Sequence, residues 1–253
     1  FFQASLGTVW TAWMGEVIPE EKRGRYVGRR TGIVGVVGMI ASLLSGWFLD
    51  SVKAPLNFQV VTLASVGFAI AAAVLLLFHA DPVKNKEQID LKDILSLPWR
   101  DANFRQFLFF AGHLHFGIFL SAALITVFFL EELHMTFSQL ALWSVIAAVT
   151  GLISTEFWGR LADRIGNRTV LFMGVCIMGV AFPVLWILAD LQDSLGYVWL
   201  SAILDAVAWG AAAPALFNLA LVSAPAGQRL SYIAMYSVVT GLFGFVGGAI
   251  SGP

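Results

Sequence analysis

Long apolar segments constrain the fold of this chain more than any other feature. A helix needs about 20 apolar residues to cross the hydrocarbon core of a bilayer. Segments of this length, preceded by a partial one at 1–14, occupy 27–49, 58–79, 104–130, 137–158, 169–189, 196–222 and 230–253. They are too long for transmembrane strands and lack the alternation that strands require. The sequence therefore predicts an all-α polytopic membrane protein.

The composition agrees with this fold class and argues against several functions. Only 12% of the 253 residues are charged, whereas a soluble domain has about 25%. The net charge of -1 gives no indication of a nucleic-acid partner. No phosphate loop, G-x-S-x-G turn or H-E-x-x-H helix is present, and the single Cys176 cannot form an internal disulfide. We predict no enzyme, no cofactor and no metal site.

Basic residues alternate between the connections and so predict the topology. One set of connections carries fourteen of the fifteen: Lys22, Arg23, Arg25, Arg29, Arg30, Lys84, Lys86, Lys92, Arg100, Arg105, Arg160, Arg164, Arg168 and Arg229. The other set keeps Lys53 beside five acids, Asp50, Glu131, Glu132, Asp190 and Asp193. The positive-inside rule places the first set in the cytoplasm. We expect a multi-pass protein of a bacterial inner membrane.

The polar stretch 81–105 is the one long connection, and it divides the chain. Pro82, Pro98 and its charged middle predict a cytoplasmic linker with a short surface helix at 90–96. We therefore expect residues 1–80 to be the C-terminal part of an N-terminal helix bundle. Residues 106–253 would form a C-terminal bundle that lacks its last helix.

An internal repeat supports this division into two bundles. Pro225, Arg229 and Tyr232 each follow Pro19, Arg23 and Tyr26 by 206 positions, and several glycines match at the same offset. Both copies enter a helix from the predicted cytoplasmic side, which is the parallel arrangement of two six-helix halves. The offset implies a complete protein of roughly 400 residues and twelve spans. We expect this chain to be truncated at both ends.

One loop carries a family signature. Gly159-Arg-Leu-Ala-Asp163-Arg164-Ile-Gly166-Asn167-Arg168 resembles the G-x-x-x-D-R-x-G-R-K/R signature of the major facilitator superfamily (MFS), although Asn167 replaces a usual basic residue. Its place after the linker matches the family's second copy, between helices 8 and 9. The segment containing Arg23 and Arg25 resembles the loop between helices 4 and 5. The resemblance covers the chain from late helix 4 to helix 11 and implies the MFS fold of two pseudo-symmetric six-helix bundles.

The resemblance also implies a role for this motif, as a latch that holds the outward-facing state. Asp163 could accept hydrogen bonds from a neighbouring helix N-terminus. Gly159 would allow a close helix contact, and Gly166 suits a turn with positive φ. Arg164 and Arg168 would pair with carboxylates or lipid phosphates. Alternatively, these two arginines serve only as positive-inside anchors.

Ionisable groups at membrane depth usually line cavities or proton paths. The candidates are His113, His115 and Asp205, with Asn218 as a neutral companion. The two histidines lie about 200° apart around a helix, so at most one should face a cavity. Trp209 follows Asp205 by one turn on the same face. This pair would bind a cationic or sugar-like substrate or carry a proton, or it would form a structural hydrogen bond.

Small residues and prolines predict local features of the helices. Gly244, Gly248 and Gly252 repeat at a four-residue spacing that favours close helix contacts. By resemblance, this helix would pack against the opposite bundle. Pro183 and Pro214 are expected to distort their helices.

These features together predict a secondary active transporter of a small solute that works by alternating access. Its partners would be membrane lipid and protons as the coupling ion, and we expect a monomer. A non-transporting membrane sensor remains an alternative. A membrane-embedded enzyme is another, and it would require His113, His115 and Asp205 to converge on one site.

Overall fold

A computed structural model describes residues 20–78, 91–225 and 228–251, and the regular secondary structure within these ranges is entirely helical. The partial helix predicted at 1–14 and most of the linker lie outside the described residues. The elements are α2 (Glu20–Ser51), α3 (Leu56–Leu76), α4 (Leu91–Arg100), α5 (Ala102–Val127), η1 (Phe128–Glu132), α6 (Phe137–Ile165), α7 (Asn167–Cys176), η2 (Ile177–Ala181), α8 (Phe182–Leu191), α9 (Gly196–Ser223) and α10 (Arg229–Ser251).

The predicted spans are confirmed. Seven helical stretches among the described residues are long and apolar enough to cross a membrane. Large apolar side chains such as Leu63 and Phe68 are exposed on the outside, as expected for a surface in lipid. α2 and α6 continue past the predicted limits, to Glu20 and Ile165. Hydropathy marks only the apolar part of a helix, whereas charged residues with good helix propensity extend it into the interface.

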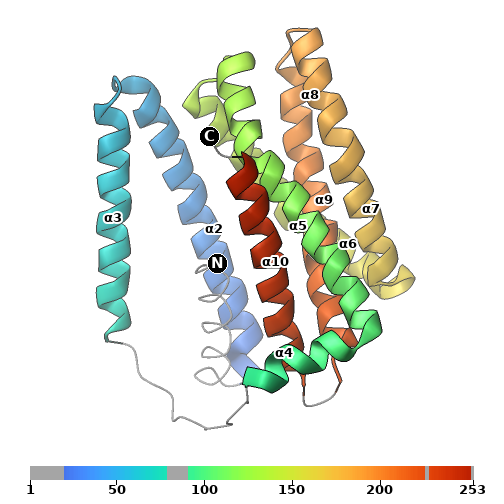
Figure 1. Cartoon of the computed structure of the whole chain (residues 1–253). Helices are drawn as coiled ribbons and strands as arrows, with labels where there is room; N and C mark the ends of the chain where they lie inside the picture. Colours follow the sequence, from blue (N-terminus) through green and yellow to red (C-terminus); the bar gives the residue numbers. More distant parts are fainter. Residues whose placement is uncertain (1–19, 79–90, 226–227, 252–253) are drawn as a thin grey trace.

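The alternating basic and acidic connections lie at opposite ends of the molecule (Figure 1). One end of the molecule contains the start of α2, helix α4, the α6–α7 turn and the start of α10. It is called here the basic end, because it carries Arg29, Arg30, Arg100, Arg105, Arg160, Arg164, Arg168 and Arg229. The α2–α3 turn, η1 and the α8–α9 turn lie at the acidic end, which carries Asp50, Glu131, Glu132, Asp190 and Asp193. The helical part of the linker, α4, lies across the basic end.

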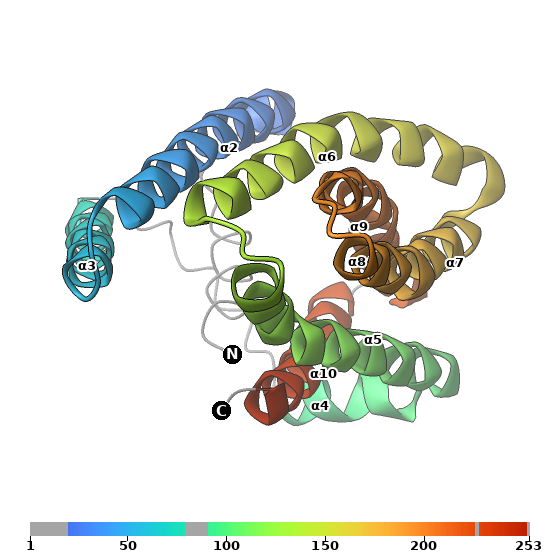
Figure 2. The same ribbon diagram turned by 90° about the horizontal axis from the view of Figure 1, so that it is seen from above.

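Helix α9 forms the centre of the second part of the chain. Seen from above, α8 and α9 lie between α5, α6 and α7 (Figure 2). The buried surface of α9 consists mainly of Ala and Gly, which let neighbouring backbones approach closely. A Cβ atom at Gly210 would lie 2.6 Å from Ser154 Oγ on α6. A Cβ atom at Gly174 on α7 would lie 3.0 Å from the carbonyl oxygen of Ala208.

Two short π-helical segments interrupt the spans. η2 ends two residues before Pro183. Proline has no N–H to donate and its ring collides with the carbonyl four residues back, so the preceding turn widens. The expected distortion at Pro183 therefore takes the form of a π-helical turn. α9 stays α-helical across Pro214.

Helix α10 packs mainly against α5 and, less extensively, against α4. A Cβ atom at Gly244 would lie 2.8 Å from the Phe119 ring, and one at Gly247 would collide with the Phe116 carbonyl oxygen. No described atom lies within 4 Å of such a Cβ atom at Gly248. Gly244 therefore contacts α5 of its own bundle and not the opposite bundle, whereas for Gly248 the expectation stays a prediction. Residue 252 lies outside the described residues.

The first part of the chain contacts the second through α2 and α6. Residues 29–38 of α2 are exposed. The described side chains of α2 that are shielded begin at Met39 and continue with Ser42, Ser45, Gly46, Phe48 and Leu49. A Cβ atom at Gly46 would lie 2.7 Å from the carbonyl oxygen of Phe137 and 2.9 Å from Ala141 Cβ. The two parts therefore meet near the acidic end.

Replacing Gly210 by Val should lower the thermal stability of the detergent-purified protein, because the added methyl groups would separate α6 from α9. Overpacking of this kind costs about 1–3 kcal/mol. Gly67→Val is the matched control, since no described atom lies within 4 Å of a Cβ atom there. Equal melting temperatures for the two variants would contradict the close packing described here.

Candidate functional site

A cavity of about 720 Å³ lies within the second part of the chain. Its walls come from α5, η1, α6, α7, η2, α8 and α9, and no residue of α2 or α3 contributes. Both π-helical segments border it, η1 through Phe129 and η2 through Met178 and Gly179. π-helical turns occur frequently at functional sites, because they change the direction of side chains within a helix.

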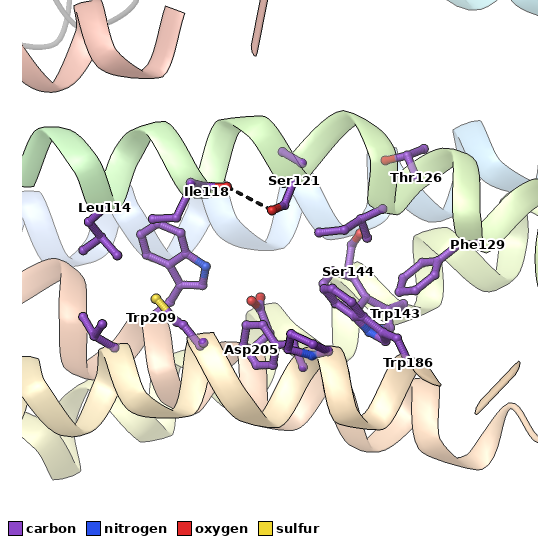
Figure 3. A pocket seen from close by; sticks show the side chains of 18 of the residues that line it. Leu114, Ile118, Ser121, Thr126, Phe129, Trp143, Ser144, Trp186, Asp205 and Trp209 are labelled. Carbon is purple, nitrogen blue, oxygen red and sulfur yellow. Dashed lines mark hydrogen bonds between the residues drawn. The ribbon is translucent and has the colours of Figure 1, made fainter. Parts of the chain in front are cut away.

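Three aromatic side chains form one end of the cavity (Figure 3). The Phe129 ring packs edge-on against Trp143 and Trp186, with centroid distances of 5.9 Å and 5.8 Å. Both indole N–H groups donate to the Ser201 hydroxyl, over 3.2 Å from Trp143 and 3.1 Å from Trp186. Ser201 is fully buried and donates to the Val198 carbonyl oxygen over 2.7 Å. One serine thus orients both tryptophans and satisfies their polar atoms.

Asp205 projects into the middle of the cavity from α9 (Figure 3). It is half-buried and lies nine residues into the helix, about 13 Å along its axis. Trp209 lines the same cavity one turn further on, and its indole nitrogen faces the carboxylate (Figure 3). Among the described residues, no Lys, Arg or His forms an ion pair with Asp205. The predicted pair therefore lies together on the cavity wall.

The structure places the two histidines differently. Nδ1 of His113 donates to the Phe109 carbonyl oxygen over 2.7 Å, and Nδ1 of His115 donates to that of Ala111 over 2.8 Å. His113 lines the cavity, whereas His115 lies outside it, edge-on to the Tyr236 ring. Hydrogen bonding within their own helix keeps Nδ1 protonated in each neutral ring. The described residues contain no cluster of three or more groups that would hold a metal ion.

Asn218 lies apart from Asp205, beside the signature loop. Its Nδ2 donates to Asn167 Oδ1 over 3.3 Å. Both border a smaller cavity of about 160 Å³ near the basic end, together with Gly159 and Asp163. Asn218 is thirteen residues beyond Asp205, about 20 Å along the helix axis. A single helix thus contributes one polar group to each cavity.

The signature loop forms the turn between α6 and α7. Gly166 ends α6 with φ 87°, as expected for a glycine required at this turn. Asp163, Arg164 and Arg168 are exposed, and a Cβ atom at Gly159 would meet no described atom within 4 Å. Within the described ranges, Asp163 binds no helix N-terminus.

Other arginines lie near this end. Arg160 forms an ion pair with Glu156, one turn earlier on α6. Arg23 and Arg25 lie in the first turns of α2, and their side chains lie outside the described residues.

A family model described as Major Facilitator Superfamily matches residues 1–248. The match covers almost the whole chain. The chain belongs to the Major Facilitator Superfamily. It is therefore an integral, multi-pass membrane protein of the transporter class. Neither the curated proteins nor the solved structures gave a match.

In this MFS protein, Asp163 of the signature motif was expected to bind the N-terminus of a neighbouring helix. Asp50 forms a contact of this kind instead. Its Oδ1 and Oδ2 accept hydrogen bonds from the backbone N–H groups of Phe137 and Ser138, each over 2.8 Å. Thr136 Oγ1 accepts a hydrogen bond from the next N–H group, that of Gln139, over 3.2 Å. The Thr136 backbone N–H in turn donates to Gln139 Oε1 over 2.8 Å. The first three N–H groups of α6 are thus satisfied.

Sequence reasoning missed this role of Asp50. The available signal was Thr136-x-x-Gln139, a capping box that marks the start of α6. Nothing local indicated that an acid 87 residues earlier would complete the cap. Through it, the acidic end of this MFS protein joins α2 to α6.

Asp50→Ala should release the start of α6 in this MFS protein. Loss of a helix cap costs about 1 kcal/mol, so we expect faster amide hydrogen exchange in the peptide that contains Phe137 and Ser138. Ser51→Ala is the control, because the Ser51 hydroxyl bonds only to Trp47 of its own helix. Unchanged exchange in Asp50→Ala would show that the cap does not hold the two helices together.

Ser201→Ala should destabilise the aromatic end of the cavity. The variant leaves two indole N–H groups without their acceptor, at a cost of about 1–3 kcal/mol. We expect a lower melting temperature and a shifted tryptophan emission spectrum. Ser144→Ala serves for comparison, since its hydroxyl bonds only to the Leu140 carbonyl oxygen. If both variants melt alike, Ser201 does not have the organising role described here.

Proposed function

We propose that this MFS protein is a secondary active transporter that moves a small solute by alternating access and is coupled to protons. The observation that carries the proposal is the cavity within the membrane spans, with Asp205 on its wall. A carboxylate at this depth is costly unless it has a charged partner or takes up a proton. A transported solute and a proton are the two partners that a carrier can exchange at such a group.

The contact between the two parts of the chain supports alternating access. α2 and α6 meet near the acidic end, where Asp50 caps α6, while residues 29–38 of α2 are exposed. At the basic end, the signature loop is not bound to a helix N-terminus of the described chain. This arrangement is expected for a state closed at the acidic end. Opening that end would require the Asp50 contact to break.

We further propose that the basic end, with the linker 81–105, faces the cytoplasm of a bacterial inner membrane. The support is the positive-inside rule, because almost all basic residues belong to connections at that end. With this orientation, the described arrangement corresponds to an inward-facing state. The units 1–80 and 106–253 would then move as the two bundles.

The enzyme alternative receives no support from the cavity. It requires His113, His115 and Asp205 to converge, and His115 does not line the cavity. A sensor would bind a solute without moving it, so the flux experiment separates it from a transporter.

Proton coupling predicts that a pH gradient drives solute flux through Asp205. In proteoliposomes containing the complete gene product, an imposed gradient should accelerate uptake of a transported solute. Asp205→Asn should abolish this response, because the amide cannot take up or release the proton. Asp193→Asn, in the α8–α9 turn, should keep it. Wild-type uptake that ignores the gradient would refute proton coupling, and saturable binding without any flux would indicate a sensor.

A further inference from the structure

We infer that the cavity around Asp205 binds a lipophilic organic cation, such as an aromatic amine or a quaternary ammonium compound. The inference rests on the proposed transport function and names the substrate class for that site. It is carried by the charge of the cavity, by the surface that its aromatic rings present, and by the hydrogen bonds that its hydroxyl groups already form.

The charge of the cavity calls for a cation. Asp205 and His113 are the only ionisable residues on its walls within the described chain. Nδ1 of His113 already donates to a carbonyl of its own helix. No lysine or arginine of the described chain lines the cavity. An unpaired carboxylate in an apolar site attracts a positive ligand, and it makes the binding of an anion unfavourable.

At the end of the cavity formed by Phe129, the aromatic side chains offer a ligand the faces and edges of their rings and no free hydrogen-bond donor. Ser201 takes both indole N–H groups of Trp143 and Trp186 on the side away from the cavity. The rings that remain exposed to a ligand are therefore carbon surfaces. Such surfaces attract alkylated and aryl cations through cation–π contacts and apolar burial. Trp209 adds another aromatic ring beside the carboxylate.

Two of the three hydroxyl groups on the described cavity walls, those of Ser121 and Ser144, are already used within their own helices. This argues against a sugar-like ligand, which was the second substrate class that the sequence suggested. Ser121 donates to the Gly117 carbonyl oxygen over 2.9 Å, and Ser144 donates to that of Leu140 over 3.2 Å. Their protons are thus used within their own helices. A polyhydroxylated ligand would lose its hydrogen bonds to water and find few replacement partners in the cavity. Each hydroxyl group left without a hydrogen bond would make the binding free energy less favourable.

The size of the cavity fits a compact drug-sized cation. Its volume of about 720 Å³ falls within the range of small-molecule sites. The carboxylate lies beside one aromatic ring and at some distance from the aromatic cluster at the far end (Figure 3). A ligand with a positive centre and an attached apolar group would satisfy both regions at once.

Equilibrium binding tests the inference without requiring transport. Radiolabelled tetraphenylphosphonium and phenyltrimethylammonium would be measured on the purified complete gene product, with tert-butylbenzene as a neutral competitor of the same shape as the smaller cation. We expect saturable binding of at least one cation and weaker competition from the neutral compound. Asp205→Asn should weaken cation binding at least tenfold, and Asp193→Asn should leave it unchanged. Trp186→Leu should weaken it more than Trp186→Phe, which keeps an aromatic ring.

The outcomes separate this inference from the proposed function. Failure of both cations to bind would overturn the inference, and flux of another solute would still support a transporter. Cation binding that is equal in wild type and Asp205→Asn would also overturn it. Saturable, Asp205-dependent binding without flux of the bound cation in proteoliposomes would uphold the binding site and refute transport. A monodisperse elution profile for each variant ensures that lost binding does not reflect misfolding.

Discussion

Close packing of small residues on α9 determines where every group of the cavity lies. In lipid, apolar surface gains little from burial between helices, so their association depends on direct contact between backbones. Gly210 against Ser154 and Gly174 against Ala208 provide that contact on two sides of α9. The helix is thereby fixed in rotation, which directs Asp205 into the cavity and Ser201 toward Trp143 and Trp186. A bulkier α9 would separate the walls of the cavity before it changed any polar group.

The contact between the two parts of the chain adds a polar interaction to the close approach at Gly46. Asp50 caps the start of α6 at an exposed position. If the cap opens there, water can bind the released N–H groups, so the penalty stays small. The same opening in the hydrocarbon core would leave these groups unsatisfied at a cost of several kcal/mol. The second bundle is thus held by tight packing of small residues, whereas the junction at its edge includes an exposed polar contact.

The sequence predicted what depends on local pattern. Span lengths follow from apolar runs, and the Asp205–Trp209 pair follows from helix periodicity, so both could be predicted without tertiary information. Asn218 shows the limit of this reasoning. It is polar and lies within a predicted span, yet its distance along α9 places it beside the signature loop. Ser201 looked unremarkable because its role depends on two tryptophans from other helices. The cap by Asp50 depends on how two distant helices dock.

A single carboxylate in the cavity also links the two proposed ligands. Asp205 can be neutralised by a proton or by an organic cation, and it cannot hold both charges at once. Each form would carry no net charge at the site through the membrane, whereas the empty ionised form would be costly there. A carrier of this kind would therefore change conformation with the proton or with the cation bound, and rarely with neither. Competition between the cation and the proton for the Asp205 carboxylate would then be enough to produce exchange of one for the other. Such exchange would require no separate proton path and no second ionisable group.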